Sequence, residues 1–165
     1  MGTNSTFDRR TAITASQAVA IVSPRDAYES PRALYQEKVA LHPVYIDAEG
    51  QESDPSVPDH LWMGNAIEPI LGRRAGQKLG MEFVHQRETV RHAKYPHVAA
   101  SPDFLSANGE FGLETKNPIH GDQYGPPGPA ESAMIPTRNI VQVYQNMAVF
   151  DRPWYLGVWA EGSLR

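Results

Sequence analysis

Two carboxylates and an ammonium lie on either side of an Asn-Gly pair. Asn108 and Gly109 are typical of a two-residue hairpin turn, and with these residues as the loop Asp103 pairs with Glu114 across the predicted strands. Directly opposed side chains have Cβ atoms about 4.5–5.5 Å apart. Carboxylates at that separation repel each other, so the pairing favours a divalent cation bound between them.

Lys116 belongs to the same predicted site. Because side chains alternate along a strand, Lys116 lies on the same face as Glu114. Oxygen-only ligation suits Mg²⁺, with Mn²⁺ as a substitute. An ammonium beside such a cation can orient an attacking water, help to deprotonate it or stabilise a pentavalent phosphate. We interpret Asp103, Glu114 and Lys116 as a site for phosphodiester hydrolysis; the alternative is an exposed hairpin with ordinary surface charges.

Composition narrows the class of protein. The chain has 165 residues, of which 41% are hydrophobic and 21% charged, and this indicates one globular domain, 1–165. It contains no cysteine, which excludes disulfides, thiol catalysis and cysteine metal sites. No apolar run approaches the roughly 20 residues of a membrane span, so we expect a soluble cytoplasmic protein. The net charge is −4, so DNA binding would depend on local basic groups and cations.

The order of predicted elements indicates an α/β fold with a mixed sheet flanked by helices. A capping box at Thr14 and Gln17 predicts one helix, and a Ser cap before Pro31 predicts a second. Further helices are expected from Asp59 to about Lys78 and from Thr137. Extended segments are expected over 81–90, 98–106, 110–117 and 153–159, with a polar arm at 1–12 and loops at 42–58 and 120–133. The six histidines show no metal-ligand spacing and are expected at the surface or in structural hydrogen bonds.

Several ordered segments resemble one nuclease family. Ser101-Pro102-Asp103 and the segment GLETKNP at 112–118 resemble the core motif of the PD-(D/E)XK nuclease superfamily. Within it, the chain is similar to the lambda-type phage exonuclease, or YqaJ-like viral recombinase, family. Three further segments agree in order: Arg9 with ITAS at 13–16, Gly64 with Glu68-Pro69, and 142–147. The resemblance covers about 9–159 and implies a restriction-endonuclease-like core.

The resemblance also implies roles for single residues. Asp103 and Glu114 would bind the metal, with the Thr115 carbonyl as a third ligand. Glu68 would act on the metal directly or through water. Lys116 would be the catalytic lysine.

Two further sites follow from the same resemblance. Gln142 would lie near the scissile phosphate, whereas Gln145 does not match the family pattern. Arg9 and Ser16 would bind a DNA 5′-phosphate, with Arg10 as an alternative to Arg9. Ser16 has independent support, because the free N–H groups and dipole of a first helical turn favour an anion.

These roles imply a Mg²⁺-dependent deoxyribonuclease, acting as a 5′→3′ exonuclease on double-stranded DNA ends in phage-type recombination. The alternatives are a nicking or structure-specific endonuclease and a catalytically silent DNA-binding module. The implied partners are double-stranded DNA, a strand-annealing protein and further copies of this chain in the family's ring trimer. No membrane is expected to take part, and the implied location is the cytoplasm of a bacterial or phage-infected cell. Phe104 replaces the family's glycine and predicts a more occluded hairpin. Because the chain ends soon after Trp159, we expect a compact member or one that lacks the C-terminal helices.

Overall fold

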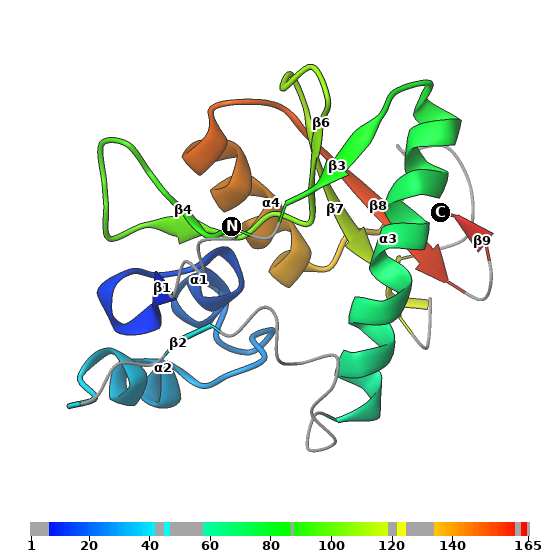
Figure 1. The fold of residues 1–165 in the computed structure, drawn as a ribbon. Coiled ribbons are helices and arrows are strands. Elements are labelled where there is room, and N and C mark those ends of the chain that lie inside the picture. The colour runs from blue at the N-terminus through cyan, green and yellow to red at the C-terminus, as the bar shows by residue number, and fades with distance from the viewer. Residues whose placement is uncertain are drawn as a thin grey trace.

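The fold is described for residues 7–41, 45–46, 58–86, 88–118, 122–124, 134–160 and 163–164 of a computed structural model (Figure 1). Its helices are α1 (Ala15–Val22), α2 (Pro31–Lys38), α3 (Asp59–Leu79) and α4 (Thr137–Phe150), with 3₁₀ turns at Arg9–Thr11 and Asp122–Tyr124. Its strands are β1 (Phe7–Asp8), β2 (Tyr45–Ile46), β3 (Phe83–His85), β4 (Val90–Arg91), β5 (Ala99–Ala100), β6 (Phe104–Ser106), β7 (Gly112–Lys116), β8 (Trp154–Ala160) and β9 (Ser163–Leu164).

The central sheet contains five strands in the order β3-β6-β7-β8-β9. Strands β7 and β8 run parallel, and the other neighbours are antiparallel. A parallel pair needs a long crossover connection, and the chain between β7 and β8 passes through α4. The mixed sheet with flanking helices that the sequence predicts is therefore confirmed.

Helices cover both faces of the sheet. Helix α3 contacts β3, β7 and β8, whereas α4 contacts β5, β7 and β8 and packs against α1 (Figure 1). The core on the α3 side contains Ala75, Phe104, Leu113 and Trp159. A Cβ atom on Gly72 would lie 2.4 Å from the Phe104 ring, so glycine permits the close approach of α3 to β6.

The predicted long helix is confirmed as α3, and it runs through Pro69 without a break. Its N-cap is Pro58, and Asp59 is the first helical residue rather than the cap. The helix ends at Gly80, where a φ of 68° favours glycine and the backbone N–H donates to the Gly76 carbonyl.

The caps of the first two helices also agree with the sequence. Thr14 is the N-cap of α1, and its backbone N–H donates to Gln17 Oε1 at 3.2 Å. Ser30 caps α2, where its Oγ accepts from the Ala33 N–H at 3.1 Å. These bonds satisfy backbone donors that a helix start otherwise leaves unpaired.

The expected polar arm is wrong for residues 7–12. Phe7 and Ala12 are buried, and β1 pairs with β2. The Arg91 guanidinium lies 4.7 Å from the centroid of the Phe7 ring. Residues 7–12 pack against the fold because Phe7 supplies an apolar side chain. The sequence prediction missed this because most residues of the segment are polar.

The hairpin has the predicted register and a different turn. Phe104 pairs with Leu113 and Leu105 with Gly112, as the sequence predicts. A two-residue type I′ turn needs positive φ at both loop residues, but only Gly109 has it, at 73°. The Gly109 N–H donates to the Ser106 carbonyl, and the chain reverses over four residues, 107–110. The register is unchanged because the longer loop only opens the innermost pair.

The remaining predicted segments lie largely outside the described residues. The loop at 42–58 is described at Tyr45–Ile46, which forms β2, and at Pro58. The loop at 120–133 is described only at its 3₁₀ turn, Asp122–Tyr124. None of the helices that the structure describes is both long enough and apolar enough to cross a membrane.

Candidate active site

Glu114 lies at the centre of the candidate site. Its side chain is only 1% exposed and points from β7 toward α4. Oε1 accepts hydrogen bonds from Lys116 Nζ at 2.6 Å and from Gln142 Nε2 at 2.6 Å. Oε2 accepts from Asn146 Nδ2 at 3.1 Å. A buried carboxylate is costly unless it is paired and hydrogen-bonded, and here three side chains hold it in one orientation.

Lys116 reaches this carboxylate because it follows Glu114 by two residues on β7. The two side chains share one face of the strand, as the sequence predicts, and form a salt bridge. The Lys116 side chain is 24% exposed, compared with 1% for Glu114. Lys116 is therefore the partner of this pair that has some contact with solvent.

Asp103 lies immediately before β6, one residue outside the strand pairing. Its Oδ2 accepts from the Thr115 backbone N–H at 2.6 Å and from Thr115 Oγ1 at 2.9 Å. Among the described residues, no hydrogen-bond donor contacts its Oδ1. Asp103 is thus fixed through one oxygen, beside the strand that carries Glu114.

The acidic side chains interact electrostatically. Burial raises the pKa of Glu114 to about 7, and the charges of Asp103 and Glu68 act in the same direction. Burial lowers the pKa of the Lys116 ammonium, but Glu114 and Asp103 outweigh it and the net shift is upward. The raised pKa of Glu114 means that burial and the neighbouring acids outweigh the stabilisation that Lys116 gives its carboxylate, and a bound cation would relieve this.

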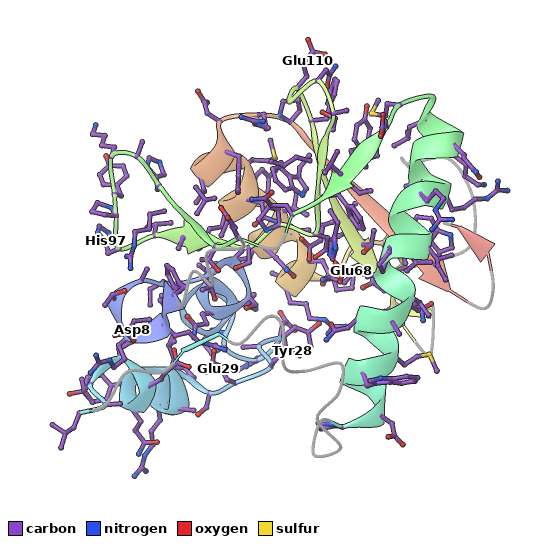
Figure 2. The ribbon with its side chains drawn as sticks, in the orientation of Figure 1. Asp8, Tyr28, Glu29, Glu68, His97 and Glu110 are labelled. Atoms are coloured by element: carbon purple, nitrogen blue, oxygen red, sulfur yellow. The ribbon has the colours of Figure 1, made fainter. Side chains whose placement is uncertain are left out.

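Glu68 approaches this group from α3. Figure 2 shows its side chain on the side of α3 that faces the sheet, whereas Glu110 lies at the far tip of the hairpin. Glu68 Oε1 lies 2.6 Å from His85 Nε2 of β3. The expectation that histidines take structural hydrogen bonds thus agrees with His85, although the sequence does not predict its acidic partner.

Helix α4 contributes three amide side chains, of which two bind Glu114 and one binds backbone carbonyls elsewhere. Gln142 and Asn146 both bind Glu114, because residues four apart share a helix face. Asn146 is fully buried, and sequence reasoning missed it although its spacing from Gln142 is a usable signal. Gln145 lies elsewhere: its Nε2 donates to the Ile13 and Ala99 carbonyls. Gln145 therefore ties α4 to the segment before α1 and to β5.

Arg9 and Ser16 lie at the two ends of the segment that leads into α1. Ser16 is exposed in the first turn of the helix. Lys38 joins the two regions, since its Nζ donates to the Arg9 carbonyl and, at 2.8 Å, to Gln17 Oε1. Glu37 lies beside them, with Oε2 3.2 Å from Arg9 Nε. The structure shows no direct hydrogen bond between the side chains of Arg9 and Ser16.

Arg9 and Arg10 differ in how much of each guanidinium is used. Arg10 binds both carboxylate oxygens of Asp8, and its Nη1 donates to the Ala40 carbonyl at 2.9 Å. In the described part of the chain, the Arg9 guanidinium forms one ion pair, between Nε and Glu37, and no side-chain hydrogen bond. Arg9 is therefore the better placed of the two to bind an anion through its terminal nitrogens.

The donor set around Asp103 fits a hard divalent cation. No three His, Asp or Glu side chains in the described ranges are gathered closely enough to hold a metal. Mg²⁺ does not need such a cage, because it often binds one or two carboxylates together with water and substrate phosphate oxygens. Asp103 and Glu114 supply the two carboxylates, and the Asp103 Oδ1 is available. The Thr115 carbonyl and Glu68 stay predictions as further ligands.

Phe104 does not cover this site. Its side chain belongs to the core on the α3 side, with Ala75 and Leu113. Glu114 follows Leu113 on β7 and faces α4 instead. The expected occlusion of the hairpin is wrong, because alternation along the strands sends Phe104 and Glu114 to opposite faces.

Comparisons with known proteins identify the family and the fold. The model of the YqaJ-like viral recombinase domain matches residues 7–153. No curated protein matches the sequence. The structure resembles the alkaline exonuclease LHK-Exo of Laribacter hongkongensis, with a TM-score of 0.62 and 18% identity over 93% of this chain and 71% of that one. It also resembles LHK-Exo in complex with dAMP, with a TM-score of 0.59 and 20% identity over the same shares. Because the family model covers most of its length, the chain belongs to the YqaJ-like viral recombinase domain family.

Proposed function

We propose that this protein is a metal-dependent deoxyribonuclease that hydrolyses phosphodiester bonds, as a 5′→3′ exonuclease on double-stranded DNA ends. The single observation that carries the proposal is the buried Glu114 carboxylate, held by Lys116, Gln142 and Asn146 beside Asp103. The family and the likeness to an alkaline exonuclease support the same chemistry.

Each side chain has its own role in the proposed hydrolysis. Gln142 and Asn146 fix the orientation of the Glu114 carboxylate. Thr115 fixes the orientation of the Asp103 carboxylate. A divalent cation held by Asp103 and Glu114 would supply positive charge to the phosphate and lower the pKa of a water molecule. The Lys116 ammonium lies beside this position and can hold the water or a phosphate oxygen.

The reaction itself is a displacement at phosphorus. Water forms a new P–O bond, the bond from phosphorus to the 3′-oxygen breaks, and the proton lost by the water balances the proton gained by the leaving oxygen. The shortened strand then carries a new 5′-phosphate. An enzyme that recognises a 5′-phosphate can therefore act again on its own product strand.

Arg9 and Ser16 favour action at an end over cleavage within a strand. The terminal nitrogens of Arg9 and the exposed hydroxyl of Ser16, in the first turn of α1, are donors that suit a phosphate. The N–H groups of that turn add to them. A nicking or structure-specific endonuclease would have no need for such a site.

One assay tests the proposal and its alternatives. Linear duplexes with 5′-phosphate or 5′-hydroxyl ends and a circular duplex are incubated with the protein in Mg²⁺ or in chelator. We expect Mg²⁺-dependent release of nucleotides from linear DNA, faster with a 5′-phosphate, and no cleavage of the circle. Cleavage of the circle would indicate an endonuclease, and no cleavage at all a silent DNA-binding module. A strand-annealing partner, a ring trimer and the cellular compartment stay predictions.

A further inference from the structure

The contact between His85 and Glu68 joins strand β3 to helix α3. His85 Nε2 lies 2.6 Å from Glu68 Oε1, and both side chains are partly exposed. When Glu68 is ionised its carboxylate only accepts hydrogen bonds, and the imidazole Nε2–H is then the donor. The bond links Glu68, which the family resemblance places near the metal, with His85, which has no role in the proposed mechanism.

The imidazole is itself held in place. His85 pairs with Phe104 across β3 and β6, and the two rings lie 5.0 Å apart between centroids at 33°. Phe104 is a buried core residue one position after Asp103. The position of the His85 ring is thus tied to the strand that leads out of Asp103.

Glu68 lies next to an interruption in the backbone hydrogen bonding of α3. It precedes Pro69, which lies inside α3 and has no N–H to donate to the carbonyl of Asn65 four residues earlier. The turn of helix that carries Glu68 therefore lacks one bond of its ladder. The contact from His85 on the neighbouring strand reaches the helix at this point.

We propose that His85 is a positioning residue, which keeps the Glu68 carboxylate turned toward Asp103 and Glu114 so that its charge acts on the cation bound there. The inference rests on the proposed function. Carboxylates at metal sites are themselves held by hydrogen bonds from neighbouring groups, and the loss of such a neighbour costs about 10–100-fold in metal affinity or activity. Glu68 already interacts electrostatically with Glu114, in agreement with this role.

The surroundings of His85 make it suitable for substitution. His85 lies at the edge of a groove of about 600 Å³ between α3 and β3, which Arg73, Gln77 and Phe83 also line. The imidazole is partly exposed there, and Leu in its place keeps an apolar side chain against the Phe104 ring. Val84 is the matched control, because its side chain is exposed on the same short strand and alternation points it away from Glu68.

The test compares His85→Gln, which keeps a donor near the position of Nε2, with His85→Leu, which removes it. Mg²⁺ affinity is measured by titration calorimetry on the DNA-free protein, and nuclease rate is measured against Mg²⁺ concentration. We expect His85→Leu to weaken Mg²⁺ binding about tenfold or more, with His85→Gln and Val84→Thr within about threefold of wild type. Equal affinities for the Gln and Leu variants would overturn the proposal.

A double-mutant cycle with Glu68→Ala, which removes the acceptor, tests whether His85 acts through Glu68. Residues that act through one contact are non-additive, so His85→Leu should add no further loss of Mg²⁺ affinity in the Glu68→Ala background. Additive losses would overturn the positioning role. A wild-type protein that binds Mg²⁺ without cleaving DNA contradicts only the proposed function, whereas one that cleaves DNA and tolerates His85→Leu contradicts only this inference. A wild-type protein that binds no Mg²⁺ contradicts both.

Discussion

Asn146 of α4 and Glu114 of β7 meet inside the protein, with Asn146 Nδ2 3.1 Å from Glu114 Oε2. Both side chains are almost completely buried. Because β7 and β8 are parallel, the chain between them passes through α4, and this crossover brings Asn146 over Glu114. Helix α4 thus both connects β7 to β8 and supplies the hydrogen bond that holds Glu114, the candidate metal ligand.

This contact predicts a loss of stability when the Asn146 amide is removed. In Asn146→Ala, Glu114 Oε2 is left buried without a donor, which costs about 1–3 kcal/mol. Asn146→Asp should cost more, because it places a second carboxylate beside Glu114. Urea unfolding in chelator measures both changes. An Asn146→Ala variant as stable as wild type would contradict the importance of the contact.

Lys116→Ala and Asp103→Ala should lose DNA cleavage while they keep the fold. Loss of one group that stabilises the transition state costs about 10²–10³-fold in rate. Initial rates on a 5′-phosphorylated duplex, with circular dichroism as the check of folding, measure the effect. Glu110→Ala is the matched control, because this acid lies at the far tip of the hairpin (Figure 2). Full activity of the Lys116 variant would refute the mechanism.

Arg9→Ala and Ser16→Ala should reduce the preference for 5′-phosphorylated ends. A hydrogen bond to a charged group is worth about 1.5–3 kcal/mol, so the ratio of rates on 5′-phosphate and 5′-hydroxyl duplexes should fall about tenfold or more for Arg9→Ala. Arg74→Ala is the control, since this arginine is exposed on α3 and binds Gln77 of the same helix. Equal wild-type rates on both ends would exclude the phosphate site.

Glu37 gives a pH dependence of known sign. Burial would raise its pKa, but hydrogen bonds from Gln17 and Lys38 and the charge of Arg9 outweigh burial, and the pKa is lowered. A carboxyl with a lowered pKa stabilises the fold above its unfolded pKa of about 4.5, and this contribution is lost as the pH falls below that value. The melting temperature of wild type should therefore exceed that of Glu37→Gln at pH 7, and the gap should narrow toward pH 3. A gap independent of pH would show that the carboxylate charge contributes nothing.

The sequence predicts those parts of the site that depend on local rules. Alternation along β7 places Lys116 beside Glu114, and the register of the hairpin follows from the position of Asn108 and Gly109. The turn type differs because Asn108 Oδ1 accepts from the Glu110 N–H and from Ser106 Oγ, so Asn108 keeps a negative φ. The hydrogen bonds of the Asn108 side chain within the turn change the conformation of the loop and leave the strand register unchanged.

The rest of the site depends on contacts between distant parts of the chain. The spacing of Asn146 from Gln142 gives only its helix face, and His85 has no local signal for its partner. Glu114 and Glu68 reach these residues only once α4 and α3 pack on the sheet. The burial of Phe7 is similar, since it depends on pairing with β2 and on Arg91. Residue types and spacing indicate which groups can do the chemistry, while tertiary packing decides which neighbours hold them.

The central claim is that Asp103 and Glu114 share one divalent cation beside Lys116. A crystal of the protein soaked in Mn²⁺ tests it most directly, through an anomalous difference map. The account predicts a peak in contact with oxygens of both Asp103 and Glu114, which is absent from a matched Asp103→Asn crystal. A wild-type map with no peak at these carboxylates, or with its peak bound by other residues, would contradict the account.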